Sequence, residues 1–235
     1  MRVGFLSTID VPFLGYFIRE FTQQGVPISA IVLDAKLQGA KDKRIHEERT
    51  AGRLPPIPLE EFESLHIPFY FVANHSSKVT ADLVRDLSLD LLVNAGTPRI
   101  LKTDILRAPS IGVVNCHPGL LPKFRGCTCV EWAIYLDEQV GNTVHFMSEG
   151  IDEGPIVLQE GLVFGEKDTY VDVRVKVYEH ANRLLARGVK KIAEESLTPK
   201  DLPPQGQGRY FKVIDDEKME LVLEKVRFGK YAYQR

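Results

Sequence analysis

Three side chains that together suit proton transfer and oxyanion binding lie at Asn115, His117 and Asp152. Asn115 and His117 are two residues apart at the end of an apolar run that predicts a strand, so they share one face of an extended chain. An amide N–H and an imidazole on one face form a donor pair for a developing oxyanion. Asp152 adds a carboxylate from a loop between Gly150 and Gly154, and the trio suits acyl transfer to an amine.

Each member of this trio also has a purely structural interpretation. An Asn-x-His at a strand end and an Asp in a glycine-rich loop are both common in turns that carry no chemistry. Cys116 alternates away from the face that Asn115 and His117 share, which argues against a nucleophilic role. The spacing of Cys116, Cys127 and Cys129 around His117 matches no common zinc ligand pattern, so we predict packing thiols and no metal.

The other histidines form no constellation that the sequence reveals. His145 lies inside a predicted strand, and we expect a structural role there rather than a partner of the trio. We expect the remaining four histidines to be surface positions: His46, His66, His75 and His180. No Gly-x-Gly-x-x-Gly follows the first predicted strand, so the sequence does not support a dinucleotide cofactor.

Alternating strand and helix patterns predict an α/β fold around these residues. Apolar runs predict five buried strands, at residues 2–7, 27–33, 67–72, 89–95 and 111–115. Amphipathic helices at 11–24 and 76–87 lie between them, as in a Rossmann-like, doubly wound, mainly parallel sheet with helices on both faces. Ligands of such sheets bind beyond the carboxyl ends of the strands, where Asn115 and His117 fall.

The later part of the chain is predicted to add further elements and a short tail. Strands are expected at 143–148 and 155–158, and helices at 127–138 and 171–195; the charged segment 35–54 reads as a surface helix or loop, or as a lid over a ligand. A Pro/Gly-rich break divides a catalytic domain, residues 1–197, from a linker and tail, residues 198–235. The tail is too short to bury its own core, so we expect it to pack on the domain or, preferably, in a homodimer.

Composition bounds the class of protein. The chain has 235 residues, with 30 Lys+Arg against 32 Asp+Glu for a net charge of −2. That balance disfavours a sequence-independent nucleic-acid binder. No apolar run is long enough to cross a membrane, and three cysteines fit a reducing compartment. We therefore expect a cytoplasmic protein with neither a nucleic-acid nor a membrane partner.

Two long segments carry a resemblance to a known family. Residues 115–126, NCHPGLLPKFRG, and residues 141–156, GNTVHFMSEGIDEGPI, resemble the signature of the folate-dependent formyltransferases. That family includes glycinamide ribonucleotide transformylase, methionyl-tRNA formyltransferase and the sugar N-formyltransferases, and the likeness extends over about residues 1–195. The resemblance implies that Asn115, His117 and Asp152 are catalytic and that 10-formyltetrahydrofolate is the formyl donor.

The same resemblance implies where the two substrates bind. The loop 94–101 resembles the segment that holds the pterin of the donor, so Arg99, Ile100 and Leu101 are expected to line that pocket. The facing loop 148–151 would complete it, with Ser148, Gly150 and Ile151. Phe124 and Arg125 are expected to border the entrance for the amine substrate.

The sequence departs from the motifs of two branches of the formyltransferase family, and these departures reduce the number of expected acceptors. Residues 7–13 lack the Gly/Ser/Asn-rich phosphate turn of glycinamide ribonucleotide transformylases, and Gly119 stands where that branch usually has Ser. Residues 198–235 are too few for the basic C-terminal barrel of methionyl-tRNA formyltransferases. The chain is most similar in size to the short sugar N-formyltransferases. We predict formyl transfer to a primary amine of a small molecule, foremost a nucleotide-linked amino sugar.

Other functions stay open at this point. The same trio would serve a formyltetrahydrofolate hydrolase, with water in place of the amine, or a formyltransferase acting on glycinamide ribonucleotide or another small amine. A catalytically silent binding module is disfavoured because all three members of the trio are present. In the predicted mechanism Asn115 and a charged His117 stabilise the oxyanion. Asp152 is expected to keep His117 charged, with a pKa above the usual value of about 6.5.

Overall fold

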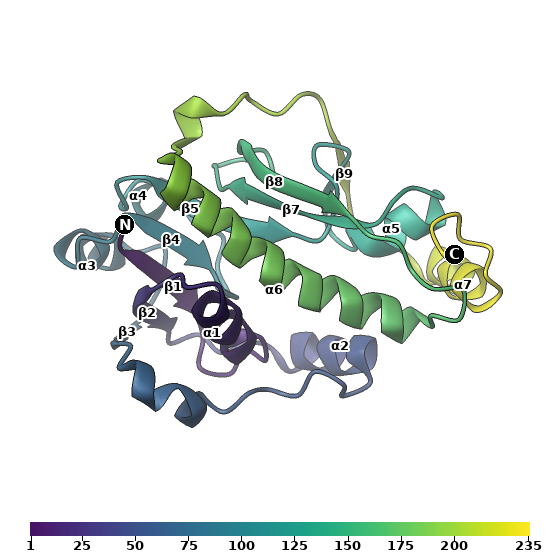
Figure 1. Cartoon of the computed structure of the whole chain (residues 1–235), viewed down its shortest axis with the longest axis horizontal. Coiled ribbons are helices and arrows are strands. Elements are labelled where there is room, and N and C mark those ends of the chain that lie inside the picture. Colours follow the sequence, from purple (N-terminus) through teal and green to yellow (C-terminus); the bar gives the residue numbers. More distant parts are fainter.

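A seven-stranded sheet in the order β3-β2-β1-β4-β5-β7-β8 forms the centre of the computed structural model, which describes residues 1–235 (Figure 1). The first five of these strands in the chain run parallel, whereas β7 is antiparallel to both β5 and β8. The bounds are β1 Val3–Ser7, β2 Ile28–Asp34, β3 Phe69–Val72, β4 Leu91–Asn94, β5 Gly112–His117, β7 Gly141–Phe146 and β8 Ile156–Gly161. The predicted mainly parallel α/β sheet is confirmed.

Helices cover both faces of this sheet, and the alternation of apolar residues along the strands explains why. Phe5 of β1 packs in one core with α1 (Leu14–Gln23) and α6 (Tyr170–Glu195). The next residue, Leu6, points to the other face and packs in a second core with α3 (Lys78–Asp86) and α4 (Thr103–Leu106). In Figure 1, α6 lies across the sheet beside α1.

The connection between β2 and β3 contains the segment that the sequence marks as highly charged. Its central part forms α2 (Ala40–Thr50), in which only Thr50 is buried, and a 3₁₀ helix follows, η1 (Leu59–Leu65). Arg49, in the last turn of α2, forms an ion pair with buried Glu131. The predicted surface helix is therefore correct, but Arg49 ties it to the core and His46 packs against Phe13 and Tyr178.

The C-terminal tail packs back on the domain. A second, two-stranded sheet pairs β6 (Phe124–Gly126) with β9 (Arg209–Phe211), beside the helices α5 (Cys129–Tyr135) and α7 (Asp216–Arg227). Residues of both parts share one core, with the tail contributing Phe211, Ile214, Val222, Val226 and Tyr231. The tail is therefore no independent unit. Large apolar side chains that stay exposed on it include Val213 and Phe228, and the homodimer remains a prediction.

The histidine expectations need correction. His75 is fully buried rather than at the surface, and its ring contacts Thr97 Oγ1 at 2.6 Å and the carbonyl of Val32 at 2.9 Å. These partners come from distant parts of the chain, so no local pattern around His75 predicts them. His46 and His180 are also partly buried and hydrogen-bonded, while His66 is exposed as expected.

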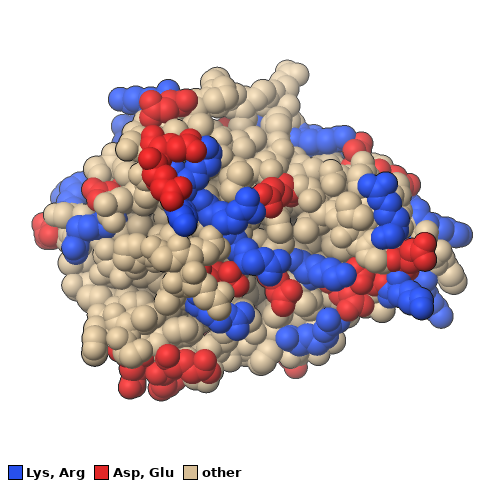
Figure 2. Space-filling view, viewed as in Figure 1, with Lys and Arg blue, Asp and Glu red and all other residues tan.

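Two surface properties bear on function. On the face seen in Figure 2, Lys and Arg side chains are interspersed with Asp and Glu, and no broad patch of one sign covers it. No helix has the length and apolar character that a membrane span requires.

Candidate active site

The carboxyl end of β5 carries the first two members of the trio. The strand continues through His117, two residues beyond its predicted end, because β7 pairs with it along that stretch: Asn115 lies opposite His145 and His117 opposite Thr143. Side chains directly opposite each other on antiparallel strands share a face. The register therefore places His145 next to the trio, which the sequence analysis missed.

His117 is buried between two oxygen acceptors. Its Nδ1 lies 3.3 Å from Asp152 Oδ2, and its Nε2 lies 2.8 Å from the carbonyl oxygen of Phe124. The side chain has room in this position because residue 119 is glycine: a Cβ there would lie 2.7 Å from His117 Nε2. The predicted contact between His117 and Asp152 is thus present, with the ring only 4% exposed.

The expectation of a raised His117 pKa is wrong. Burial lowers the pKa of His117 below its usual value, and Asp152 and the Phe124 carbonyl only partly oppose that effect. A neutral imidazole can donate to just one of the two oxygens, whereas a protonated ring donates to both. Loss of hydration therefore disfavours the protonated ring, whereas the two oxygen acceptors beside its nitrogens favour the protonated ring. Such a group is suited to take up a proton during a reaction and to release it again.

The amide of Asn115 has a defined orientation. Asn94 Oδ1 accepts hydrogen bonds from the backbone N–H groups of Gly96 (3.2 Å) and Thr97 (3.0 Å), so its Nδ2 must face Asn115. That nitrogen donates to Asn115 Oδ1 over 3.0 Å. The Nδ2 group of Asn115 consequently points away from Asn94, and it lies 3.4 Å from His145 Nε2. One of its hydrogens remains free for an oxyanion.

His145 completes the group as a neutral ring. Its Nδ1 lies 2.9 Å from the carbonyl of Phe146, and its Nε2 lies 3.7 Å from Asp152 Oδ1. Burial lowers the pKa of His145 to about 4, against the attraction of Asp152. The ring is therefore uncharged near neutrality, donates through Nδ1 and offers Nε2 as an acceptor toward Asn115.

Asp152 reaches the trio from a tight loop. Its own φ is +55°, in the left-handed region, and its Oδ2 accepts a hydrogen bond from the Gly126 N–H over 2.9 Å. Gly154, two residues later, admits no side chain, since a Cβ there would lie 1.8 Å from the carbonyl oxygen of Phe146. The structure therefore brings Asn115, His117 and Asp152 together as the sequence predicted.

The two loops expected to hold the formyl donor lie at this same edge of the sheet. Thr103 Oγ1 donates to Glu149 Oε1 over 2.7 Å, which links the segment after Leu101 to the loop 148–151. Exposed apolar side chains flank the link, with Ile100 82% and Ile151 51% exposed. Apolar surface therefore lies open on both loops.

Backbone groups are what the first donor loop offers to a ligand. The Arg99 guanidinium is already engaged, because it donates to both carboxylate oxygens of Asp34 and to the carbonyl of Ala73. The backbone N–H groups of Arg99, Ile100 and Leu101 have no hydrogen-bond partner within the chain. These N–H groups can therefore donate to a ligand, and the binding of the formyl donor at this loop stays a prediction.

The predicted amine-binding residues need correction. The Phe124 side chain is 1% exposed and stacks on Phe211, so only its carbonyl faces the site. The Arg125 guanidinium donates to Gln205 and to the carbonyl of Gly206, and its side chain is 12% exposed. Both side chains are occupied by contacts with the tail, which the sequence analysis did not place near them.

A cavity of about 180 Å³ opens next to Asn115 instead. It is bounded by α1, α6 and the ends of β4 and β5, and its lining includes Phe13, Tyr178 and Asn182. Asn182 is 5% exposed, and its side chain makes no hydrogen bond within the chain. This amide is available for a ligand that enters the cavity.

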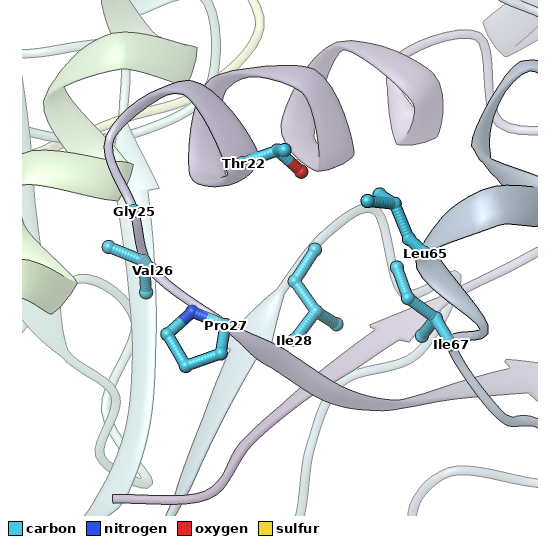
Figure 3. A pocket seen from close by; sticks show the side chains of 7 residues that line it. All are labelled: Thr22, Gly25, Val26, Pro27, Ile28, Leu65 and Ile67. Atoms are coloured by element: carbon cyan, nitrogen blue, oxygen red, sulfur yellow. The ribbon is translucent and has the colours of Figure 1, made fainter.

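The cavity shown in Figure 3 has no such chemistry. It measures about 340 Å³ and lies between the end of α1 and the start of β2, whose carboxyl end is the one that faces the trio. Its lining is mostly aliphatic, and the one hydroxyl, from Thr22, donates to the Ile18 carbonyl. We assign no catalytic role to it.

Comparisons with known proteins identify the family of the chain. The family model described as formyl transferase matches residues 2–189. Methionyl-tRNA formyltransferase from Pelotomaculum thermopropionicum is 28% identical over 92% of this chain and 66% of its own length. The enzyme of the same name from Clostridium tetani is 32% identical over 85% and 61%. This chain thus spans less than two thirds of either relative.

Solved structures share the fold at low sequence identity. Glycinamide ribonucleotide transformylase 1 from Symbiobacterium toebii has a TM-score of 0.63 and 22% identity, covering 92% of this chain and 94% of that one. A sugar N-formyltransferase from a Shewanella species has a TM-score of 0.62 and 18% identity, covering 96% and 87%. Because the family match extends over most of the chain and includes the trio, this protein belongs to the formyl transferase family.

Proposed function

We propose that this protein transfers a formyl group from 10-formyltetrahydrofolate to a primary amine of a small molecule. The observation that carries this proposal is the group of buried His117 with partly buried Asn115 and Asp152 at the carboxyl edge of the sheet, in a chain of the formyl transferase family. Between them these residues supply an oxyanion donor and a proton acceptor with a carboxylate behind it, as acyl transfer to nitrogen requires.

In the proposed mechanism the amine nitrogen forms a bond to the formyl carbon, and the carbonyl oxygen becomes an oxyanion. The free N–H of Asn115 stabilises that oxygen. His117 accepts the proton that the attacking nitrogen loses, and Asp152 stabilises the imidazolium that results. The C–N bond to the donor then breaks, and His117 returns the proton to the leaving nitrogen of tetrahydrofolate.

The cavity beside Asn115 supports a compact polar acceptor. Phe13 and Tyr178 stack with their ring centroids 5.2 Å apart, and the amide of Asn182 provides a polar contact at the cavity wall. A sugar ring presents hydroxyl groups to an amide and C–H faces to aromatic rings. We therefore favour an amino sugar as the acceptor, with its nucleotide directed toward solvent.

A second candidate acceptor is methionyl-tRNA. It is favoured by the names of the sequence relatives, and this weighs against the expectation that no nucleic acid takes part. On the face seen in Figure 2, Lys and Arg are interspersed with Asp and Glu. We prefer the small amine because the cavity beside Asn115 offers the Asn182 amide and the stacked rings of Phe13 and Tyr178.

A formylation screen separates these alternatives. The protein is incubated with 10-formyltetrahydrofolate and, in parallel, nucleotide-linked amino sugars, glycinamide ribonucleotide, methionyl-tRNA or no acceptor, and products are read by mass spectrometry. A formylated amino sugar that the Asn115→Ala variant does not form supports the proposal. Formyl transfer confined to tRNA would overturn the acceptor class, and formate release at full rate without an acceptor would indicate a hydrolase.

A further inference from the structure

The segment between α6 and β9 passes close to the trio. It leaves the end of α6 and arches around the β8 side of the molecule before returning to β9 (Figure 1). This part of the chain lies beyond the family match, which ends at residue 189. The segment contains Gln205, which is partly buried and makes hydrogen bonds to the loop that carries Asp152.

Each polar atom of the Gln205 side chain has a defined partner. Nε2 donates to the carbonyl oxygen of Asp152 over 3.1 Å and to that of Gly154. Oε1 accepts from the Arg125 guanidinium over 3.0 Å, which fixes the orientation of the amide. Arg125 also donates to the carbonyl of Gly206, so the segment is held on both sides of Gln205.

We propose that Gln205 is a positioning residue for Asp152, and this inference rests on the proposed formyl transfer. Asp152 adopts a left-handed backbone that side-chain-bearing residues rarely adopt. Gln205 holds the carbonyls of Asp152 and Gly154, which lie on either side of Glu153. Its two hydrogen bonds thereby keep the carboxylate where it meets both His117 Nδ1 and the Gly126 N–H.

A role in anchoring the tail does not explain these contacts. The tail has its own attachment points: the Cys127 N–H donates to Phe211 O over 2.9 Å, and Trp132 Nε1 donates to Lys212 O over 2.8 Å. β9 also pairs with β6 along three residues. Both hydrogen bonds that Gln205 donates go to the loop of Asp152 instead.

Gln205→Leu and Gln205→Glu test the proposal, with Gln207→Leu as the matched control. Leu removes every hydrogen bond, whereas Glu keeps an acceptor for Arg125 but cannot donate to the two loop carbonyls when ionised. Gln207 lies in the same segment, is exposed and makes no side-chain hydrogen bond. Formyl transfer is measured as kcat and KM, and amide hydrogen exchange is followed by NMR at Gly126 and Cys127.

The expected result is a kcat about 10- to 100-fold lower in both Gln205 variants, with little change in KM, because displacement of a reacting group by about 1 Å has effects of that size. Exchange should become faster at Gly126, which donates to Asp152, and stay unchanged at Cys127, which reports the pairing with the tail. Gln207→Leu should behave as the wild type.

Two outcomes would overturn the inference. One is a Gln205→Leu variant with normal kcat and normal exchange at Gly126. The other is a loss of protection at both Gly126 and Cys127, which would assign Gln205 a role in holding the tail. A wild-type protein with no formyl transfer to any acceptor would instead remove the proposed function, whereas exchange at Gly126 would still report whether Gln205 holds the loop.

Discussion

Two buried groups of ionisable residues differ in the partners that surround their carboxylates. Glu131 on α5 is 1% exposed and is met by Arg174 at 3.3 Å, Arg49 at 3.4 Å and the Tyr170 hydroxyl at 2.6 Å. Burial raises the pKa of the Glu131 carboxyl, but the two guanidinium groups outweigh that effect and hold the pKa below its usual value. This group is a fixed set of charges, because arginine does not lose its proton.

Asp152 at the sheet edge has only histidines as its ion-pair partners. His117 and His145 lie 3.3 Å and 3.7 Å away, and burial lowers the pKa of both rings. The net charge of Asp152 and its two histidines therefore changes when one ring gains or loses a proton. The comparison shows that burial alone does not make a reactive site: permanent cations stabilise a structure, and titratable partners leave a proton free to move.

Neutralising Glu131 should have the largest effect on the free energy of unfolding. Glu131→Gln leaves Arg174, itself 2% exposed, as a buried charge with no carboxylate partner. We expect a loss of about 3–5 kcal/mol in urea unfolding, while kcat of the folded protein stays near that of the wild type. The matched surface variant is Glu48→Gln, which breaks an exposed pair with Arg44.

That control should change the stability by less than about 1 kcal/mol. Equal losses in Glu131→Gln and Glu48→Gln would show that the buried cluster is no more important than a surface pair. A folded Glu131→Gln protein with a strongly reduced kcat would also contradict the comparison, because it would show that the Glu131 cluster takes part in the reaction.

Removing a member of the trio should lower kcat strongly and change the free energy of unfolding little. His117→Ala and Asn115→Ala each take away a group that acts on charge developing in the reaction, so kcat should fall about a thousandfold, equivalent to about 4 kcal/mol. The affinity for the donor should change little. Steady-state kinetics and a binding titration check both statements, and near-normal turnover in either variant would remove that residue from the mechanism.

A smaller effect is expected from Asn94, which orients Asn115 without touching the reacting atoms. Asn94→Asp keeps the acceptor for the N–H groups of Gly96 and Thr97 but loses the donor to Asn115 Oδ1. We expect kcat to fall about tenfold, with an unchanged KM for the donor. If Asn94→Asp is fully active while Asn94→Leu is impaired, Asn94 holds its loop and does not orient Asn115.

The sequence predicted the sheet and the trio because both leave local signals. Apolar runs on both faces mark the parallel strands, and Asn115 and His117 share a face at any strand end. The loop around Asp152 is marked by its two flanking glycines, one of which admits no side chain. These features depend on residues near one another in the chain.

The remaining parts of the site depend on contacts between distant residues. The position of His145 beside Asn115 follows from the register of β5 and β7, which the spacing of a His inside a strand does not reveal. Gln205 lies in a Pro/Gly-rich segment that resembles an ordinary linker, and its hydrogen bonds cross about fifty positions of sequence. The lowered pKa of His117 comes from burial, which no charge pattern in the sequence encodes.

The pH dependence of formyl transfer in Asp152→Asn tests most directly the claim that Asp152 and His117 move one proton. His117 must be neutral to accept the proton of the amine, so kcat should fall as the pH drops through the His117 pKa, which burial places below its usual value. Asp152 opposes that lowering. Without its charge the acid limb of the kcat profile should move to lower pH and the plateau should fall at least about tenfold. A near-normal plateau with an unmoved limb would contradict the account and leave Asp152 as a turn residue.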